Sequence, residues 1–153
     1  MDIYRFLDEN GIIYERYDHP PVYTCEEAER LVPPLAAAST KNIFLRDKAG
    51  KRHFLVAIGY EKRVDLKSLS TLLDVRSLSL ASSERLKRHL GVDPGSVSLL
   101  GIVNNPDNSV EIVIDEDLWR AEALACHPLV NTSTLVISRD DIEKMIGKTG
   151  HEF

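Results

Sequence analysis

The sequence predicts an α+β fold, a mixed and mostly antiparallel twisted sheet surrounded by helices, within a single domain over residues 1–153. Short apolar segments joined by hairpin-type turns stand next to segments with helical spacing and N-cap residues. Strands and full-length helices do not alternate strictly, which disfavours a doubly wound parallel sheet. A chain of 153 residues buries about 68–70% of its unfolded surface, enough for a core without disulfides or a structural metal.

The first third of the chain is expected to hold a helix, a strand and a second helix. Asp2 can cap a helix whose apolar residues have helical spacing and which ends at Gly11. Residues 12–17 are expected to form a strand, and the His-Pro-Pro sequence at 19–21 ends it. A capping box then begins a helix over residues 24–31.

The middle of the chain is expected to form a hairpin, a helix, a strand and a further helix. The hairpin is indicated by two apolar segments around a Gly-containing turn, and the helices by their caps. The expected bounds are 43–46 and 54–58 for the hairpin, a helix beginning at Asp65, 75–80 for the strand, and a helix from Ser82 or Ser83 to Gly91.

The last third is expected to form a second hairpin, a strand and a terminal helix. Residues 97–103 and 110–114 flank the turn sequence Asn-Asn-Pro-Asp-Asn, which favours pairing between them. Residues 134–137 are expected to form the last strand, and Ser138 to cap a helix that runs to Ile146.

Composition excludes several classes of protein. The formal net charge of -5 argues against a strongly basic nucleic-acid binder, although a local basic patch remains compatible with RNA contact. No apolar run is long enough to span a bilayer and the amino terminus is no signal peptide, so we expect a cytoplasmic protein without membrane contact. Cys25 and Cys126 are expected to be reduced thiols. Phosphate-loop, dinucleotide, zinc and serine-hydrolase motifs are missing from the sequence, so we expect neither a metal nor a cofactor.

Four local features have both a functional and a structural interpretation. Lys41 and Asn42 open an apolar strand and could hold a phosphate or an oxyanion, or form a solvated strand start. Gly101 interrupts an apolar run, which indicates either a bulge or a close approach to a ligand. His127 lies between Cys126 and a proline, near small polar residues, and suits a pocket wall or the surface. The fourth is Tyr23-Thr24, where a capping box and a hydrophobic staple suffice as explanation.

Taken in order, these segments resemble the YbaK/prolyl-tRNA synthetase-associated editing-domain family. The resemblance runs from about Phe6 to Ile146, and its most specific parts are the Lys-Asn strand and the His-Pro-Leu-Val-Asn-Thr segment. Within the family the chain is most similar to the free-standing Ala-tRNA(Pro) deacylases. The resemblance implies a compact α+β domain that hydrolyses an amino acid wrongly esterified to tRNA, and so serves translation fidelity.

The resemblance also implies roles for individual residues. Lys41 corresponds to the family's essential lysine, expected to hold the phosphate at the terminal adenosine, and Asn42 to its polar neighbour. Gly101 corresponds to a glycine that approaches the ester, where its N–H could stabilise an oxyanion, and His127 to the residue that shapes the alanine pocket. The remaining positions implied to contact the substrate are Tyr23 and Thr24 at the pocket rim, Ser98, Pro128, Thr132, and Arg76 at the acceptor stem.

Because an aminoacyl ester is already activated, positioning and oxyanion stabilisation can suffice for its hydrolysis. The expected partner is the acceptor end of mischarged tRNA(Pro), with prolyl-tRNA synthetase or an elongation factor as candidate protein partners. Three alternatives remain open at this level: a Cys- or Ser-tRNA deacylase of the same family, a non-catalytic relative that binds tRNA or another ligand, and a thiol hydrolase using Cys126. The sequence leaves open the group that activates water and the oligomeric state.

Overall fold

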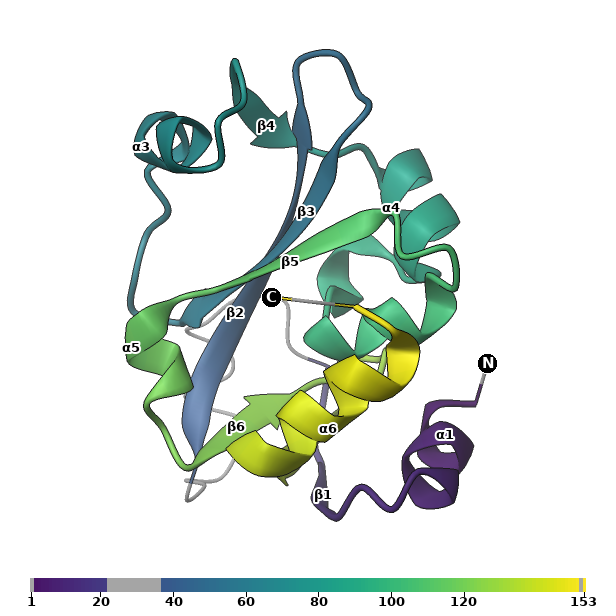
Figure 1. Ribbon diagram of the computed structural model, residues 1–153. Coiled ribbons are helices and arrows are strands. Elements are labelled where there is room, and N and C mark those ends of the chain that lie inside the picture. The colour runs from purple at the N-terminus through teal and green to yellow at the C-terminus, as the bar shows by residue number, and fades with distance from the viewer. Residues whose placement is uncertain (1, 22–36, 152) are drawn as a thin grey trace.

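The computed structural model describes residues 2–21, 37–151 and 153, and its central feature is a seven-stranded mixed sheet (Figure 1). One half contains β1 (Tyr14–Asp18), β7 (Ser133–Ser138) and β6 (Ala123–Cys126). The other half contains β3 (His53–Gly59), β5 (Val110–Ile114) and the short β4 (Leu78–Leu80). The long strand β2 (Ala38–Asp47) belongs to both halves.

Antiparallel pairing dominates this sheet, as the sequence predicted. The pairs β1·β7, β6·β7, β2·β3 and β2·β4 are antiparallel, whereas β2·β6 and β3·β5 are parallel. The β2·β6 contact consists of two residue pairs, Ala38↔Leu124 and Ser39↔Ala125. The expected α+β class is therefore confirmed.

The sheet separates two hydrophobic cores. The larger core lies between the sheet and α1 (Ile3–Glu9), α4 (Ser83–Leu90), η2 (Leu99–Asn104) and α6 (Arg139–Thr149). The smaller core lies under α3 (Leu66–Leu72), which Figure 1 shows on the other side of the β2–β3 ribbon from α4. Alternation along β2 sends Phe44 to the larger core and Leu45 to the smaller one.

Capping residues fix the helix ends that the sequence predicted. The Asp2 carboxylate accepts from the Tyr4 and Arg5 amides, and Asp65, Ser82 and Ser138 cap α3, α4 and α6 in the same way. Gly91 ends α4 with a φ of 68°, a conformation that favours glycine. Helix α6 continues past Ile146 to Thr149.

The second expected hairpin is wrong. Residues 99–104 form the 3-10 helix η2, which follows a short turn, η1 (Pro94–Ser96), and β5 pairs in parallel with β3 instead. The strand expected over 75–80 is confined to β4, and the one expected over 12–17 is β1, Tyr14–Asp18. The sequence did not predict β6 or α5 (Glu116–Trp119). The helix expected over 24–31 lies outside the described residues.

Candidate active site

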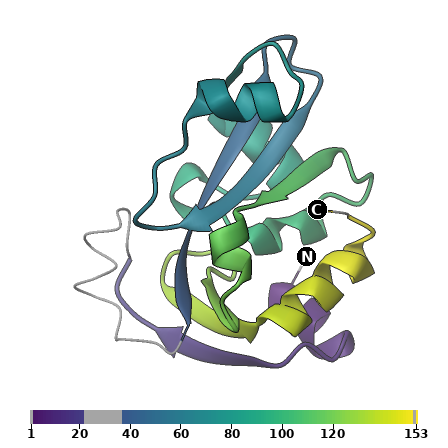
Figure 2. The same cartoon turned by 60° about the vertical axis from the view of Figure 1, so that its left-hand side comes forward.

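One face of the β1–β7–β6 half of the sheet carries polar residues at the ends of its strands. Leu124, Cys126, Leu135 and Ile137 point into the larger core. Their neighbours must therefore point to the opposite face, where Ala125 and Val136 are only half-buried. Val136 pairs with Ala125, so alternation along β7 and β6 places Thr134 and His127 on this same face. Tyr17 pairs with Thr134, so His19, two residues further along, also lies on it. Ser39 of β2 pairs with Ala125, so Lys41 lies on it as well. Figure 2 shows the start of β2 reaching this half of the sheet.

His127 is held directly after the end of β6. Its Nδ1 lies 3.2 Å from the Ser133 carbonyl, and because a carbonyl only accepts, Nδ1 carries the proton. Its own carbonyl accepts from the Ser98 hydroxyl at 2.6 Å. Nε2 of the neutral ring therefore keeps its lone pair, and it has no hydrogen-bond partner among the described residues. Burial lowers the pKa of His127; the hydrogen bond to Ser133 opposes this and the charge of His19 adds to it.

His19 lies beside His127 on the same face. Their ring centroids are 6.5 Å apart, in an edge-to-face arrangement. His19 Nδ1 lies 2.9 Å from the Pro20 carbonyl, and Nε2 lies 2.8 Å from the Thr134 hydroxyl. The site therefore contains two imidazoles, each fixed through Nδ1 to a backbone carbonyl.

Lys41 provides positive charge on this face. Its Nζ donates to the Lys62 carbonyl. Lys62 itself is neutralised by Asp115 and Asp117, at 2.7 and 2.5 Å, whereas no carboxylate among the described residues forms an ion pair with Lys41. The ammonium group of Lys41 thus remains electrostatically available to an anion such as a phosphate.

The loop between β6 and β7 carries backbone strain. Leu129 has a φ of 66°, a conformation that costs a bulky residue energy and that recurs at functional sites. Pro128 and the side chain of Ser98 are buried, so they support the loop from inside. Thr132 is exposed, and its carbonyl accepts from the His19 amide at 2.9 Å.

The structure does not bring every expected site residue to this face. Gly101 is buried in η2, its N–H donates to the Ser98 carbonyl at 2.9 Å, and the expected oxyanion donor is therefore already used. Asn42 points to the larger-core face because it neighbours Lys41 in a strand, and its buried Oδ1 has no hydrogen-bond partner among the residues that the structure describes. Arg76 is exposed between α3 and β4. Tyr23 and Thr24 lie outside the described residues.

Sequence reasoning did not select His19 or Thr134 as site residues. The His-Pro-Pro sequence at 19–21 indicates the end of a strand and forms part of the family resemblance. The signal that could have found His19 is repetition, since the chain has two His-Pro dipeptides, His19-Pro20 and His127-Pro128. Each dipeptide directly follows a strand, and the two strands flank β7.

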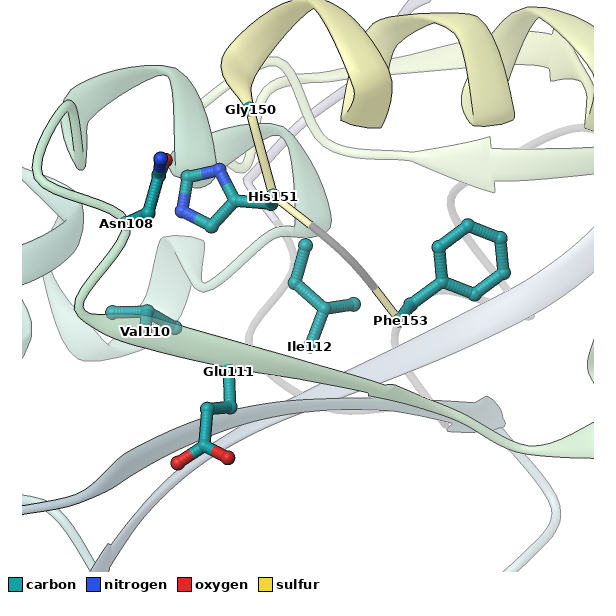
Figure 3. Close-up of a pocket in the computed structure, with 7 residues that line it drawn as sticks. All are labelled: Asn108, Val110, Glu111, Ile112, Gly150, His151 and Phe153. Carbon is teal, nitrogen blue, oxygen red and sulfur yellow. The ribbon is translucent and has the colours of Figure 1, made fainter.

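A separate cavity of about 430 Å³ lies on the other side of the molecule, against β5 and the end of α6 (Figure 3). It is lined by Asn108, Val110, Glu111, Ile112, Gly150, His151 and Phe153. His151 there is already bonded to Thr149 and Asn105. None of these residues belongs to the face with the two imidazoles, so we do not assign the hydrolytic site to this cavity.

The described part of the chain contains no cluster of three metal-ligating side chains. Across those same residues, no helix has the length and apolar character needed to cross a bilayer.

Comparison with known proteins identifies the family. Residues 19–145 match the aminoacyl-tRNA editing domain family. The prolyl-tRNA editing protein ProX of Acetoanaerobium sticklandii is 38% identical over 96% of this chain and 90% of its own length. The prolyl-tRNA synthetase associated domain-containing protein 1 of Danio rerio is 32% identical over 98% of this chain and 82% of its own length. The chain belongs to the aminoacyl-tRNA editing domain family, a family of deacylating hydrolases.

The fold is also found among solved structures. The crystal structure of the hypothetical protein APE2540 superposes with a TM-score of 0.77 at 20% identity, covering 96% of this chain and 95% of the other. At this identity the likeness concerns the fold alone.

Proposed function

We propose that the protein is a trans-editing hydrolase that removes alanine from mischarged tRNA(Pro) in the cytoplasm. The observation that carries the proposal is the face that Lys41 and His127 share. Among the described residues, Lys41 has no carboxylate partner and Nε2 of the neutral His127 ring has no hydrogen-bond partner. The name of the Acetoanaerobium sticklandii relative, a prolyl-tRNA editing protein, supports the choice of tRNA(Pro).

In this mechanism Lys41 binds a phosphate near the acylated 3′ end and so places the ester over the imidazole. His127 Nε2 accepts a proton from a water molecule whose oxygen bonds to the ester carbonyl carbon. The carbon–oxygen bond to the ribose then breaks, and the ribose oxygen takes the proton back from Nε2. Free alanine and intact tRNA leave, and the protein returns to its starting state.

Selectivity for alanine follows from the limits of the synthetase. A pocket built for proline cannot strongly reject a smaller side chain, because missing methylenes change binding by only about 1–3 kcal/mol. A second site that admits alanine and excludes proline by size corrects that error. In this proposal the wall of the alanine pocket is held by Pro128, which is buried within the loop that carries His127, and by the buried Ser98, whose hydroxyl donates to the His127 carbonyl.

The test is deacylation of purified Ala-, Cys-, Ser- and Pro-tRNA(Pro) by the wild type and Lys41→Ala. We expect the wild type to release alanine only, and the variant to lose at least about a hundredfold in kcat/KM because the ester is no longer positioned. Lys48→Ala is the matched control, since Lys48 is an exposed lysine at the β2–β3 turn, and it should retain wild-type turnover.

Each alternative gives a different result in this assay. Release of cysteine or serine in preference to alanine would move the protein to another branch of its family. Tight binding of tRNA without release of any amino acid would identify a non-catalytic binder. Full turnover by Lys41→Ala would remove Lys41 from the mechanism.

A further inference from the structure

The end of β1 is hydrogen-bonded to residues 132–133, the same short segment that holds the His127 ring. The His19 amide donates to the Thr132 carbonyl at 2.9 Å, and the Asp18 carboxylate accepts from the Ser133 hydroxyl at 2.6 Å. The Ser133 carbonyl accepts the hydrogen bond that His127 Nδ1–H donates. A displacement of His19 therefore moves the anchor of His127.

When His19 is neutral, its side-chain contacts define a single tautomer. The Pro20 carbonyl can only accept, so Nδ1 carries the proton and Nε2 of the neutral ring is an acceptor. The Thr134 hydroxyl at 2.8 Å then donates to Nε2. Thr134 is buried at 5% exposure, so water competes poorly for this bond. The ring consequently has a fixed direction, in an edge-to-face arrangement with the His127 ring.

Few charged groups surround His127 in the described part of the chain. His19 approaches from the end of β1, with Asp18 next to it bound to Ser133. Lys41 of β2 lies on the same face, and η2 contributes the uncharged Ser98 hydroxyl. Burial is the main reason that the pKa of His127 is lowered, and the protonated form of His19 lowers it further.

We propose that His19 is a positioning residue of the editing site, which together with Thr134 holds the His127 ring in the orientation and tautomer that turn Nε2 toward the ester. This inference rests on the proposed function. It adds a second histidine, which acts through His127 and does not itself touch the substrate.

The first experiment compares the wild type with His19→Gln, in which an uncharged side chain of similar length replaces the imidazole. We expect kcat for Ala-tRNA(Pro) to fall about tenfold or more with KM within about twofold, because a misplaced catalytic group slows chemistry without weakening RNA binding. The acid limb of the pH profile should move to higher pH, because loss of His19 removes an influence that lowers the pKa of His127.

The second experiment changes the partner of His19. Thr134→Val keeps the shape of the side chain but removes the hydroxyl, and should reduce kcat in the same direction as His19→Gln. Thr134→Ser restores the hydroxyl and should recover most of the lost rate. Recovery by serine distinguishes a hydrogen bond from a packing requirement.

The control is His151→Gln, which removes a buried histidine from the opposite side of the molecule. It should lower stability and leave the acid limb of the pH profile unchanged. The inference is overturned if His19→Gln retains wild-type kcat and pH profile, or if His151→Gln shifts the profile equally.

A direct measurement separates this inference from the proposed function. Titration of the imidazole resonances of His127 by nuclear magnetic resonance needs no substrate and should show a higher pKa in folded His19→Gln than in the wild type. If the wild type releases no alanine but this shift appears, the proposed function fails and the coupling between the histidines stands. If the pKa of His127 is the same in His19→Gln and in the wild type, the coupling between the two histidines is disproved, whatever the enzyme assay shows.

Discussion

Cys126 precedes His127 in the sequence, yet its thiol is enclosed by the larger core at 2% exposure. Burial raises the pKa of Cys126 to about 12, so the reactive thiolate is essentially absent at neutral pH. Adjacent residues at the end of a strand also point to opposite faces, which separates this thiol from the imidazole. These facts contradict the thiol hydrolase that the sequence left open.

Cys126→Ala should therefore retain turnover within about twofold and lower the free energy of unfolding by about 1 kcal/mol, because a small buried group is removed from the core. Alanine release and urea denaturation measure the two effects. A folded variant without activity would restore the thiol mechanism.

Position in the chain was enough to select Lys41 and His127, because each stands where an apolar strand meets polar residues. Their shared face could not be predicted, since it depends on the parallel β2·β6 register between segments more than 80 residues apart. His19 was missed for the same reason. Its role depends on Thr134, which lies 115 positions further along the chain.

At the scale of elements, η2 packs closely against α4. A Cβ on Gly101 would lie 3.2 Å from the Cβ of Leu90, a rigid part of that side chain. The absence of a side chain at Gly101 thus permits this packing, and its N–H is committed to Ser98.

Gly101→Ala should lower the free energy of unfolding by about 1–3 kcal/mol through overpacking. The matched control is Gly59→Ala in β3, where a Cβ would meet nothing within 4 Å, and this change should be close to neutral. Thermal or chemical denaturation of both variants decides the point. Equal stability of the two variants would mean that η2 and α4 are more loosely packed than described.

Helices with side-chain caps were predictable from sequence because the signals are local. The residues of η2 were not, since an aliphatic run such as Leu-Leu-Gly-Ile-Val suits a buried strand as well as a buried helix. Tertiary contacts decide between them. Ser98 accepts from the Leu100 amide, and the Asn104 amide group donates to the Leu90 carbonyl, which ties this segment to α4.

Across the whole molecule, buried histidines make the fold sensitive to mild acid. His53 is buried between Phe44 and His89, and its Nε2 accepts from Arg85 at 3.0 Å. Burial, with the charges of His89 and Arg85, lowers the pKa of His53 to about 4. The pKa values of His89, His127 and His151 are also lowered, chiefly by burial.

A histidine whose pKa is lower in the folded state binds its proton preferentially in the unfolded chain. The contribution of such a histidine to the free energy of unfolding is complete above a pH of about 6.5 and is lost as the pH falls below this value. For His53 the loss by a pH of about 4 is at most about 3 kcal/mol. The free energy of unfolding measured across this range should therefore decline. In His53→Gln, which keeps an acceptor for Arg85, the decline should be shallower. An identical slope would show that His53 does not contribute to it.

The narrow β2·β6 junction has a consequence for RNA binding. The two halves of the sheet meet there through two residue pairs and a 2.6 Å bond from the Thr40 hydroxyl to the Ala125 carbonyl. Lys41 stands on one side of the junction and His127 on the other. In the proposed mechanism, a tRNA end that contacts both side chains bridges the two halves of the sheet, so the stiffness of this two-pair junction contributes to the affinity for tRNA.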